Sequence, residues 1–314
     1  LNQLYFYILE IRALLVSAEY FDNKLVQLFT SSFANILSTY EREFVEIGTD
    51  TRDRLNGKVF IALKGESYDA HQFLDQAVQQ GAAALIVHEL PEQFKFLKEK
   101  VSILFVKDTL QALQDWAQAY RQNLKTQIIG ITGSNGKTTT KELVYAVLAS
   151  HFKTYTTQGN LNNHIGVPLT LLSFTSETEI GIVEMGANHK KEIEFLCDLA
   201  QPDFGYITNF GKAHLEGFGG VEGVIQGKSE MYHYLSQNNK CAFINLEDPI
   251  QVEKSKALQF YSFGINKAEA NVNISAVSAN PFVVIMYSDI KISTHLIGLY
   301  NANNINAALT IGKY

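Results

Sequence analysis

Four residues, Gly133, Gly136, Lys137 and Thr138, have the types and spacing of a phosphate-binding loop. An apolar, strand-like run precedes them and a helix-like segment follows. Glycines let backbone N–H groups turn towards an anion, and the N-terminus of the next helix adds a partial positive charge. The lysine can reach the terminal phosphates of a nucleotide, and the threonine hydroxyl can bind Mg²⁺. The residues predicted to hold a nucleotide are Gly133, Ser134, Asn135, Gly136, Lys137, Thr138 and Thr139.

This loop departs from the strict consensus at one position. The consensus places a glycine five residues before Gly136, where this chain has Ile131. A glycine-rich turn that binds no nucleotide is therefore the alternative interpretation. The Gly-Lys-Thr sequence between a strand and a helix favours the phosphate loop.

Three further residues could serve a metal or an acid–base step. Glu184 ends the predicted strand 179–184, and an acid at the carboxyl end of a parallel strand can bind Mg²⁺ beside a phosphate loop. His214 lies in a glycine-rich loop just after the strand 205–209. A lone histidine is more often structural, and a lysine on a helix, such as Lys228, is usually only solvated.

Asparagines gather at two places in the chain. Asn160, Asn162 and Asn163 form an amide-rich turn, which could bind a sugar or peptide or could only make local bonds to the backbone. Asn301 and Asn304 open a predicted helix, which they could cap or from which they could recognise a base.

The elements that must position these residues alternate between strands and helices, which predicts an α/β fold with two domains. We expect a small N-terminal α/β domain over residues 1–124 and a central domain over 125–314 with a mostly parallel sheet flanked by helices. Residues 1–45 carry helical patterns but no recognisable site, and residues 257–296 are β-rich. The N-terminal domain is expected to contain strands at 57–63, 82–87 and 101–106 and helices at 72–81 and 109–122.

Composition excludes several classes of protein. The 314 residues are 46% hydrophobic with a net charge of −6, and the pI near 5.8 argues against broad nucleic-acid binding. No long uncharged apolar run is present, and residues 1–16 do not match a signal peptide, so we expect a cytoplasmic protein without membrane insertion. The two cysteines, Cys197 and Cys241, match no metal spacing and are expected to be free thiols.

Taken together, the motifs resemble the Mur ligase family, ATP-dependent ligases that add amino acids to the peptidoglycan precursor. The resemblance extends from about Gly48 to the end of the chain. In this family the early glycine of the loop stands where Gly133 does, which accounts for Ile131. The motifs that carry the resemblance are GSNGKTT (133–139), EMGA (184–187), TNFGKAHLE (208–216), KSE (228–230) and NANN (301–304).

The segment GNLNNHIGVPLT (159–170) is similar to that of family members that add D-alanyl-D-alanine to UDP-N-acetylmuramoyl-tripeptide through an acyl phosphate. The resemblance implies ATP and Mg²⁺ as cofactors, with Lys137, His214 and Lys228 in catalysis. It implies metal binding by Thr138, Glu184, His214 and a carbamylated Lys228, and nucleotide contacts from Asn301 and Asn304. It also implies substrate contacts from Asp50, Thr51, Arg52, Asn160 and Asn163.

The chain begins with Leu1 and stops at Tyr314 inside a helix-like run, before the third domain of the family. We therefore expect a monomeric fragment that lacks the C-terminal domain, binds nucleotide weakly at best and does not ligate alone. The alternatives are a ligase for the third residue with a dipeptide acceptor, a folylpolyglutamate-type ligase, and a non-catalytic nucleotide-binding protein. A switch GTPase is disfavoured because no Asn-Lys-x-Asp motif is present.

Overall fold

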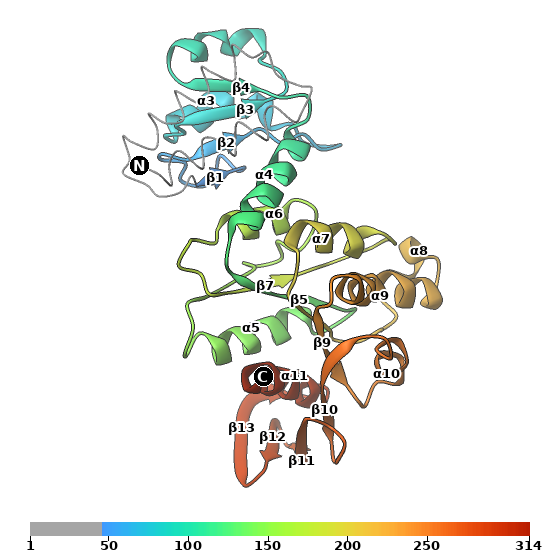
Figure 1. The fold of residues 1–314 in the computed structure, drawn as a ribbon. Coiled ribbons are helices and arrows are strands. Elements are labelled where there is room, and N and C mark those ends of the chain that lie inside the picture. Colours follow the sequence, from blue (N-terminus) through green and yellow to red (C-terminus); the bar gives the residue numbers. More distant parts are fainter. Residues whose placement is uncertain (1–45) are drawn as a thin grey trace. The chain divides into compact units, whose positions relative to one another are not determined.

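A computed structural model describes residues 46–314, drawn in Figure 1. The helical patterns and the lack of a signal peptide predicted within residues 1–45 lie outside the described residues. The chain divides into two compact units. The first contains the described residues up to Asn123 together with Leu171–Thr175, and the second contains Leu124–Thr170 and Ser176–Tyr314.

The first unit is built on a four-stranded parallel sheet in the order β1-β2-β3-β4. Apolar side chains of the strands, Phe60 and Leu85 among them, pack with Leu74 and Leu97 of the helical segments. The strands are β1 (Ile47–Gly48), β2 (Val59–Ile61), β3 (Ala84–Val87) and β4 (Ser102–Phe105). The helical segments are η1 (Ala70–Phe73), α3 (Leu74–Gln79), η2 (Glu92–Glu99) and α4 (Thr109–Asn123).

The second unit is built on a nine-stranded sheet in the order β13-β12-β11-β10-β9-β8-β5-β7-β6. Pairing is parallel from β6 through to β11 and antiparallel between β11, β12 and β13. The strands are β5 (Gln127–Thr132), β6 (Thr154–Thr156), β7 (Ile180–Glu184), β8 (Phe204–Ile207), β9 (Cys241–Asn245), β10 (Gln259–Ile265), β11 (Val272–Ala279), β12 (Phe282–Tyr287) and β13 (Ile290–Ile297). The helices are α5 (Lys137–Leu148), α6 (Gly166–Leu172), α7 (Glu192–Ala200), α8 (Leu215–Phe218), α9 (Val221–Gln237), α10 (Pro249–Lys254) and α11 (Asn301–Lys313).

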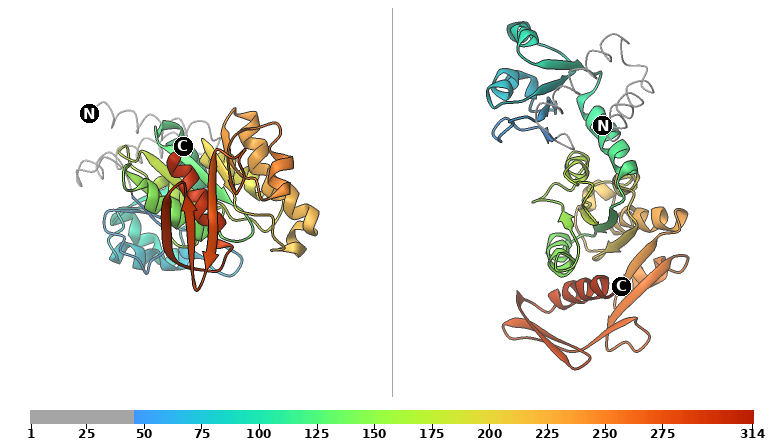
Figure 2. Two further views of the ribbon diagram at one scale, coloured as in Figure 1. Left: turned by 90° about the horizontal axis from the view of Figure 1, so that it is seen from below. Right: turned by 60° about the vertical axis from the view of Figure 1, so that its left-hand side comes forward.

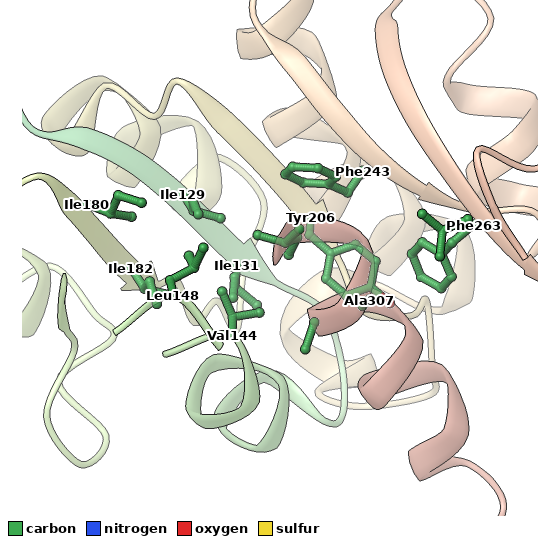
Figure 3. Packing of buried hydrophobic residues seen from close by; sticks show 13 residues of the cluster. Ile129, Ile131, Val144, Leu148, Ile180, Ile182, Tyr206, Phe243, Phe263 and Ala307 are labelled. Atoms are coloured by element: carbon green, nitrogen blue, oxygen red, sulfur yellow. The ribbon is translucent and has the colours of Figure 1, made fainter. Parts of the chain in front are cut away.

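Helices cover both faces of this sheet. Ile129 and Ile131 of β5 point towards α5 and α11, where they join the core shown in Figure 3. Helices α5 and α11 lie side by side, green and dark red in Figure 2. On the other face, a Cβ on Gly130 would lie 3.1 Å from Cε of Met231 in α9. The alternation of side chains along a strand thus places the loop after β5 between two helical layers.

The structure confirms the predicted fold class, an α/β chain with a mostly parallel sheet and flanking helices. The β-rich region predicted over residues 257–296 contains strands β10 to β13. Cys197 and Cys241 are free thiols. Over residues 46–314, no helix combines the length and the apolar character needed to cross a membrane.

Candidate nucleotide and metal site

The predicted phosphate loop joins β5 to α5 at the carboxyl edge of the parallel strands. Gly133 and Gly136 have φ angles of +135° and +80°, in the region that favours glycine. A Cβ on Gly133 would collide with the hydroxyl of Thr208, and one on Gly136 would lie 3.1 Å from Oδ1 of Asn304. Gly136 immediately precedes α5, so the free N–H groups of that helix's first turn face the loop.

The tip of the loop is held by the segment that follows β8. The N–H of Asn135 donates to Oδ1 of Asn209 (3.2 Å), and Nδ2 of Asn209 donates to the carbonyl of Asn135 (2.9 Å). The Thr208 hydroxyl donates to the same carbonyl at 2.5 Å. Ser134 adds two bonds, from its N–H to the Asn209 carbonyl and from its hydroxyl to the Gly211 carbonyl. These bonds fix the conformation of the loop between β5 and α5.

Glu184 ends β7, directly beside β5 in the sheet, and only 1% of it is exposed. Its Oε2 accepts the Thr138 hydroxyl at 3.0 Å, and its Oε1 accepts Nδ2 of Asn162 at 2.8 Å. Mg²⁺ takes oxygen ligands, commonly one or two carboxylates together with substrate phosphates and water. A carboxylate beside a hydroxyl at the start of a phosphate-loop helix fits that requirement.

Lys137 is folded back onto the loop. Its Nζ donates to the carbonyl of Gly133 at 2.8 Å and to that of Ser134 at 3.4 Å. Burial lowers the pKa of this amine, and the negative charge of Glu184 opposes that shift. The amine therefore lies at the loop, where it can reach an anion.

Lys228 of α9 is 2% exposed, unlike a solvated helix lysine. Its Nζ donates to the Ala187 carbonyl at 3.3 Å and lies 5.2 Å from the centre of the Phe218 ring. Burial, and after it the charge of Lys137, lower its pKa to about 8, while Glu192 and Glu230 oppose the change. Near neutral pH, a substantial fraction of a lysine with this pKa is neutral, and the neutral form of an amine is the reactive one.

Asn301 and Asn304 are buried in the first turn of α11. Nδ2 of Asn304 donates to Oδ1 of Asn301 at 2.8 Å, and the hydroxyl of Thr140 donates to Oδ1 of Asn304 at 3.2 Å. The residue that precedes the helix is Tyr300, and it makes no side-chain capping bond. The capping interpretation is therefore wrong. Asn304 instead joins α11 to the phosphate-loop helix, and Nδ2 of Asn301 donates to the Ile297 carbonyl at the end of β13 at 2.9 Å.

His214 is exposed and has a left-handed φ of +55° at the start of α8. No group of three or more His, Cys, Asp or Glu within residues 46–314 is arranged to hold a metal ion. A magnesium site here would thus depend on ligands outside that set, such as the Thr138 hydroxyl, phosphate oxygens or a modified Lys228. The role of His214 as a metal ligand stays a prediction.

The amide-rich turn follows β6, and its asparagines have different roles. Asn160 is exposed, whereas Oδ1 of Asn163 accepts the N–H groups of Ile165 and Gly166 at the start of α6. For Asn163 the local-bond interpretation therefore holds, and its contact with a substrate stays a prediction. Asn162, which is not among the predicted substrate contacts, reaches the carboxylate of Glu184.

The predicted substrate-binding residues Asp50, Thr51 and Arg52 belong to the first unit. Nε of Arg52 donates to Oδ1 of Asp50 at 2.9 Å, and this hydrogen bond is the largest cause of the lowered pKa of that carboxyl. Thr51 is buried, while the side chain of Arg52 is 86% exposed. The three residues thus form a local turn with an accessible guanidinium.

Sequence reasoning missed three residues that hold the site together. Asn162 lies within the amide-rich turn, so its position was a signal, but the turn alone does not show which asparagine faces the carboxylate. Lys141 is fully buried and donates to the Thr157 carbonyl at 2.6 Å. Thr157 in turn accepts the N–H of Glu184 through its hydroxyl at 3.0 Å.

Comparison with known proteins yields two family matches. The Mur ligase middle domain matches residues 131–312, and the Mur ligase family catalytic domain matches residues 43–121. The chain is 37% identical over 277 residues to UDP-N-acetylmuramoyl-tripeptide–D-alanyl-D-alanine ligase of Bacillus subtilis, covering 88% of this chain and 60% of that protein. The relative with the same name from Haemophilus influenzae is 38% identical over 295 residues, covering 91% of this chain and 63% of that protein.

Solved structures give the same result. MurF from Acinetobacter baumannii superposes with a TM-score of 0.73 at 33% identity, covering 85% of this chain and 59% of that one. MurF from Thermotoga maritima, solved in complex with ADP, gives a TM-score of 0.70 at 29% identity, covering 86% of this chain and 62% of that one. The chain spans less than two thirds of the length of these relatives. Because the middle-domain match alone takes in more than half of the sequence, the chain belongs to the Mur ligase family.

Proposed function

We propose that this chain provides the nucleotide and acceptor sites of an ATP-dependent ligase that adds D-alanyl-D-alanine to UDP-N-acetylmuramoyl-tripeptide in peptidoglycan synthesis. The observation that carries the proposal is the bond between Thr138 and Glu184 beneath a glycine loop that can enclose a phosphate. The names of the relatives support the choice of acceptor and amine.

In this proposal the loop binds the phosphates of ATP. The N–H groups at the start of α5 and the amine of Lys137 would contact the phosphate oxygens, because they are the positive groups at that end of the loop. Ser134, Asn135 and Thr139 complete the loop around the nucleotide. Asn301 and Asn304 would contact the nucleotide from α11, which their bonds fix beside the loop.

The metal would be held by Thr138 and Glu184, with His214 and a carbamate on Lys228 at a second position. When bound, Mg²⁺ supplies positive charge that offsets the repulsion between ATP and a carboxylate acceptor. Lys228 can form a carbamate because its neutral amine attacks carbon dioxide, forming a C–N bond and releasing one proton. The modification turns a buried cation into an anion that suits a metal ion.

The acceptor would lie against the turn that contains Asn160 and Asn163, whose amides can bond to peptide groups. Asp50, Thr51 and Arg52 would contact its UDP part. The terminal carboxylate of the acceptor takes the γ-phosphoryl group and releases ADP. The amine of D-alanyl-D-alanine then attacks the acyl carbon, and phosphate leaves through a tetrahedral intermediate.

We also propose that the protein acts as a monomer in the cytoplasm, where ATP and UDP-linked precursors are available. It would need no nucleic acid and no membrane insertion for this reaction.

Titration calorimetry with the chain tests the function. We expect binding of ATP with Mg²⁺ that is lost in Lys137→Ala and kept in Lys291→Ala, a change to an exposed lysine of β13. UDP-N-acetylmuramoyl-tripeptide should bind more tightly than the dipeptide form. Preference for the dipeptide would favour the ligase for the third residue. Binding of ATP without either precursor would favour a nucleotide-binding protein, and no binding of ATP would refute the proposal.

A further inference from the structure

The carboxylate of Glu184 is shared between two loops. One oxygen, Oε2, accepts the hydroxyl of Thr138 in the phosphate-loop helix. The other, Oε1, accepts Nδ2 of Asn162 in the turn after β6. A carboxylate can rotate about its terminal bond, so two donors on opposite oxygens fix its plane.

The turn that carries Asn162 is itself fastened next to Glu184. The N–H of Gly186 donates to the carbonyl of Asn162 at 2.7 Å. A Cβ on Gly186, two residues after Glu184, would lie 2.8 Å from Oδ1 of Asn162, so this glycine leaves the room that the asparagine side chain occupies. The position of Asn162 therefore depends on the same strand end that carries the carboxylate.

Further hydrogen bonds hold the start of this turn, at Thr157. The fully buried amine of Lys141 donates to the Thr157 carbonyl, and the Thr157 hydroxyl accepts the N–H of Glu184. Lys141 belongs to α5, the helix that the phosphate loop begins. The turn is thus tied to Glu184 at both ends and to the phosphate-loop helix at one.

We propose that Asn162 is a positioning residue, which orients the carboxylate of Glu184 towards the metal by donating to its Oε1. This inference rests on the proposed function, because it assigns to Glu184 a magnesium ion between protein and nucleotide. Partners of metal-binding carboxylates and histidines hold their ligands in the binding orientation, and their loss typically weakens metal affinity or activity by 10–100-fold.

The test compares ATP affinity by calorimetry in excess Mg²⁺ and in chelator, so that the metal-dependent part is separated from the rest. In Asn162→Ala the gain in affinity from Mg²⁺ should shrink by about tenfold, while affinity in chelator stays within about twofold of wild type. Asn238→Ala is the control, because that exposed amide at the C-terminal end of α9 makes a single local bond, to the Tyr234 carbonyl at 2.9 Å. It should change neither value.

A double-mutant cycle shows whether Asn162 acts through the carboxylate. In a Glu184→Gln background, Asn162→Ala should have no further effect on the metal-dependent part. Asn162→Leu, which keeps a branched side chain without a donor, replaces Asn162→Ala if that variant does not fold. The role of Asn162 would be overturned by any of three results. In Asn162→Ala, Mg²⁺ could raise ATP affinity as much as in wild type, or ATP affinity could fall equally in chelator. In the double-mutant cycle, the effects of the two substitutions could be additive. A wild-type chain that binds no ATP would overturn both this inference and the proposed function.

Discussion

The hydroxyl of Thr138 and the carboxylate of Glu184 meet at 3.0 Å although they lie 46 positions apart in the sequence. One is in the first turn of α5 and the other is the last residue of β7. They meet because β5 and β7 pair in parallel with Ile131 opposite Glu184, so the loop after β5 passes the end of β7. The sheet register therefore builds the proposed metal site.

This relationship predicts different results for two substitutions of Thr138. Thr138→Val keeps the shape but removes the hydroxyl, so the gain in ATP affinity from Mg²⁺ should fall by about tenfold or more. Thr138→Ser keeps the hydroxyl and should retain most of that gain. Calorimetry in Mg²⁺ and in chelator measures both. Equal behaviour of the two variants would show that the hydroxyl is not a ligand.

Gly133 is predicted to tolerate no side chain. Its φ of +135° is unfavourable for alanine, and the added Cβ would collide with the Thr208 hydroxyl and lie 2.9 Å from its backbone nitrogen. Gly133→Ala should lower the free energy of unfolding by about 2–5 kcal/mol. Gly219→Ala is the control, since Gly219 has a φ of +76° and open space around it. That change should cost only about 1–2 kcal/mol, and equal losses in urea unfolding would contradict the steric argument.

Much of this architecture follows from local pattern. The alternation of apolar runs with amphipathic segments predicts the parallel sheet, and glycine, lysine and threonine at fixed spacing predict the loop. Local pattern does not give strand order, because β8 and β7 flank β5 only through pairings between distant segments. The two hydrogen bonds between Asn209 and Asn135 depend on that strand order, so the sequence alone does not predict them.

Side chains of one type also look alike in a sequence. Asn162 and Asn163 are neighbours, yet one reaches Glu184 and the other caps α6, because the turn points them in different directions. Lys141 is a lysine on a helix, a residue that is usually solvated, yet it is completely buried. Such differences depend on tertiary packing, which overrides local preference.

Lys228 is expected to form a carbamate more readily than the exposed lysines. Its pKa of about 8 means that the neutral, reactive amine becomes the main form as pH rises through that value. Carbon-13 NMR in labelled bicarbonate should therefore show a carbamate signal that grows between about pH 7 and 9. Lys228→Met should lack the signal. A signal that persists in this variant, or that is missing in the wild type, would contradict the assignment.

The last prediction concerns His71 in the first unit, which is 1% exposed. Its Nε2 accepts the N–H of His88 at 3.1 Å, so Nδ1 carries the proton and donates to Asp69 at 2.7 Å. Burial lowers the pKa of His71, although the hydrogen bond to Asp69 opposes the shift. Protonation of Nε2 would place two donors face to face. Nitrogen-15 NMR should therefore show one neutral tautomer persisting below the usual pKa of about 6.5.

The sign of the effect on stability follows from linkage. As pH falls below about 6.5, the unfolded chain takes up a proton that folded His71 does not, so the free energy of unfolding decreases. Burial alone would raise the pKa of Asp69, but hydrogen bonds from His71 and Lys64 lower it to about 2. The free energy of unfolding should thus decrease a second time as pH falls from about 3.8 to about 2, where folded Asp69 takes up its proton. In urea unfolding, His71→Gln should flatten the decrease in the free energy of unfolding that begins below about pH 6.5. A pKa of His71 at or above 6.5 would show that the assignment of a buried neutral tautomer is wrong.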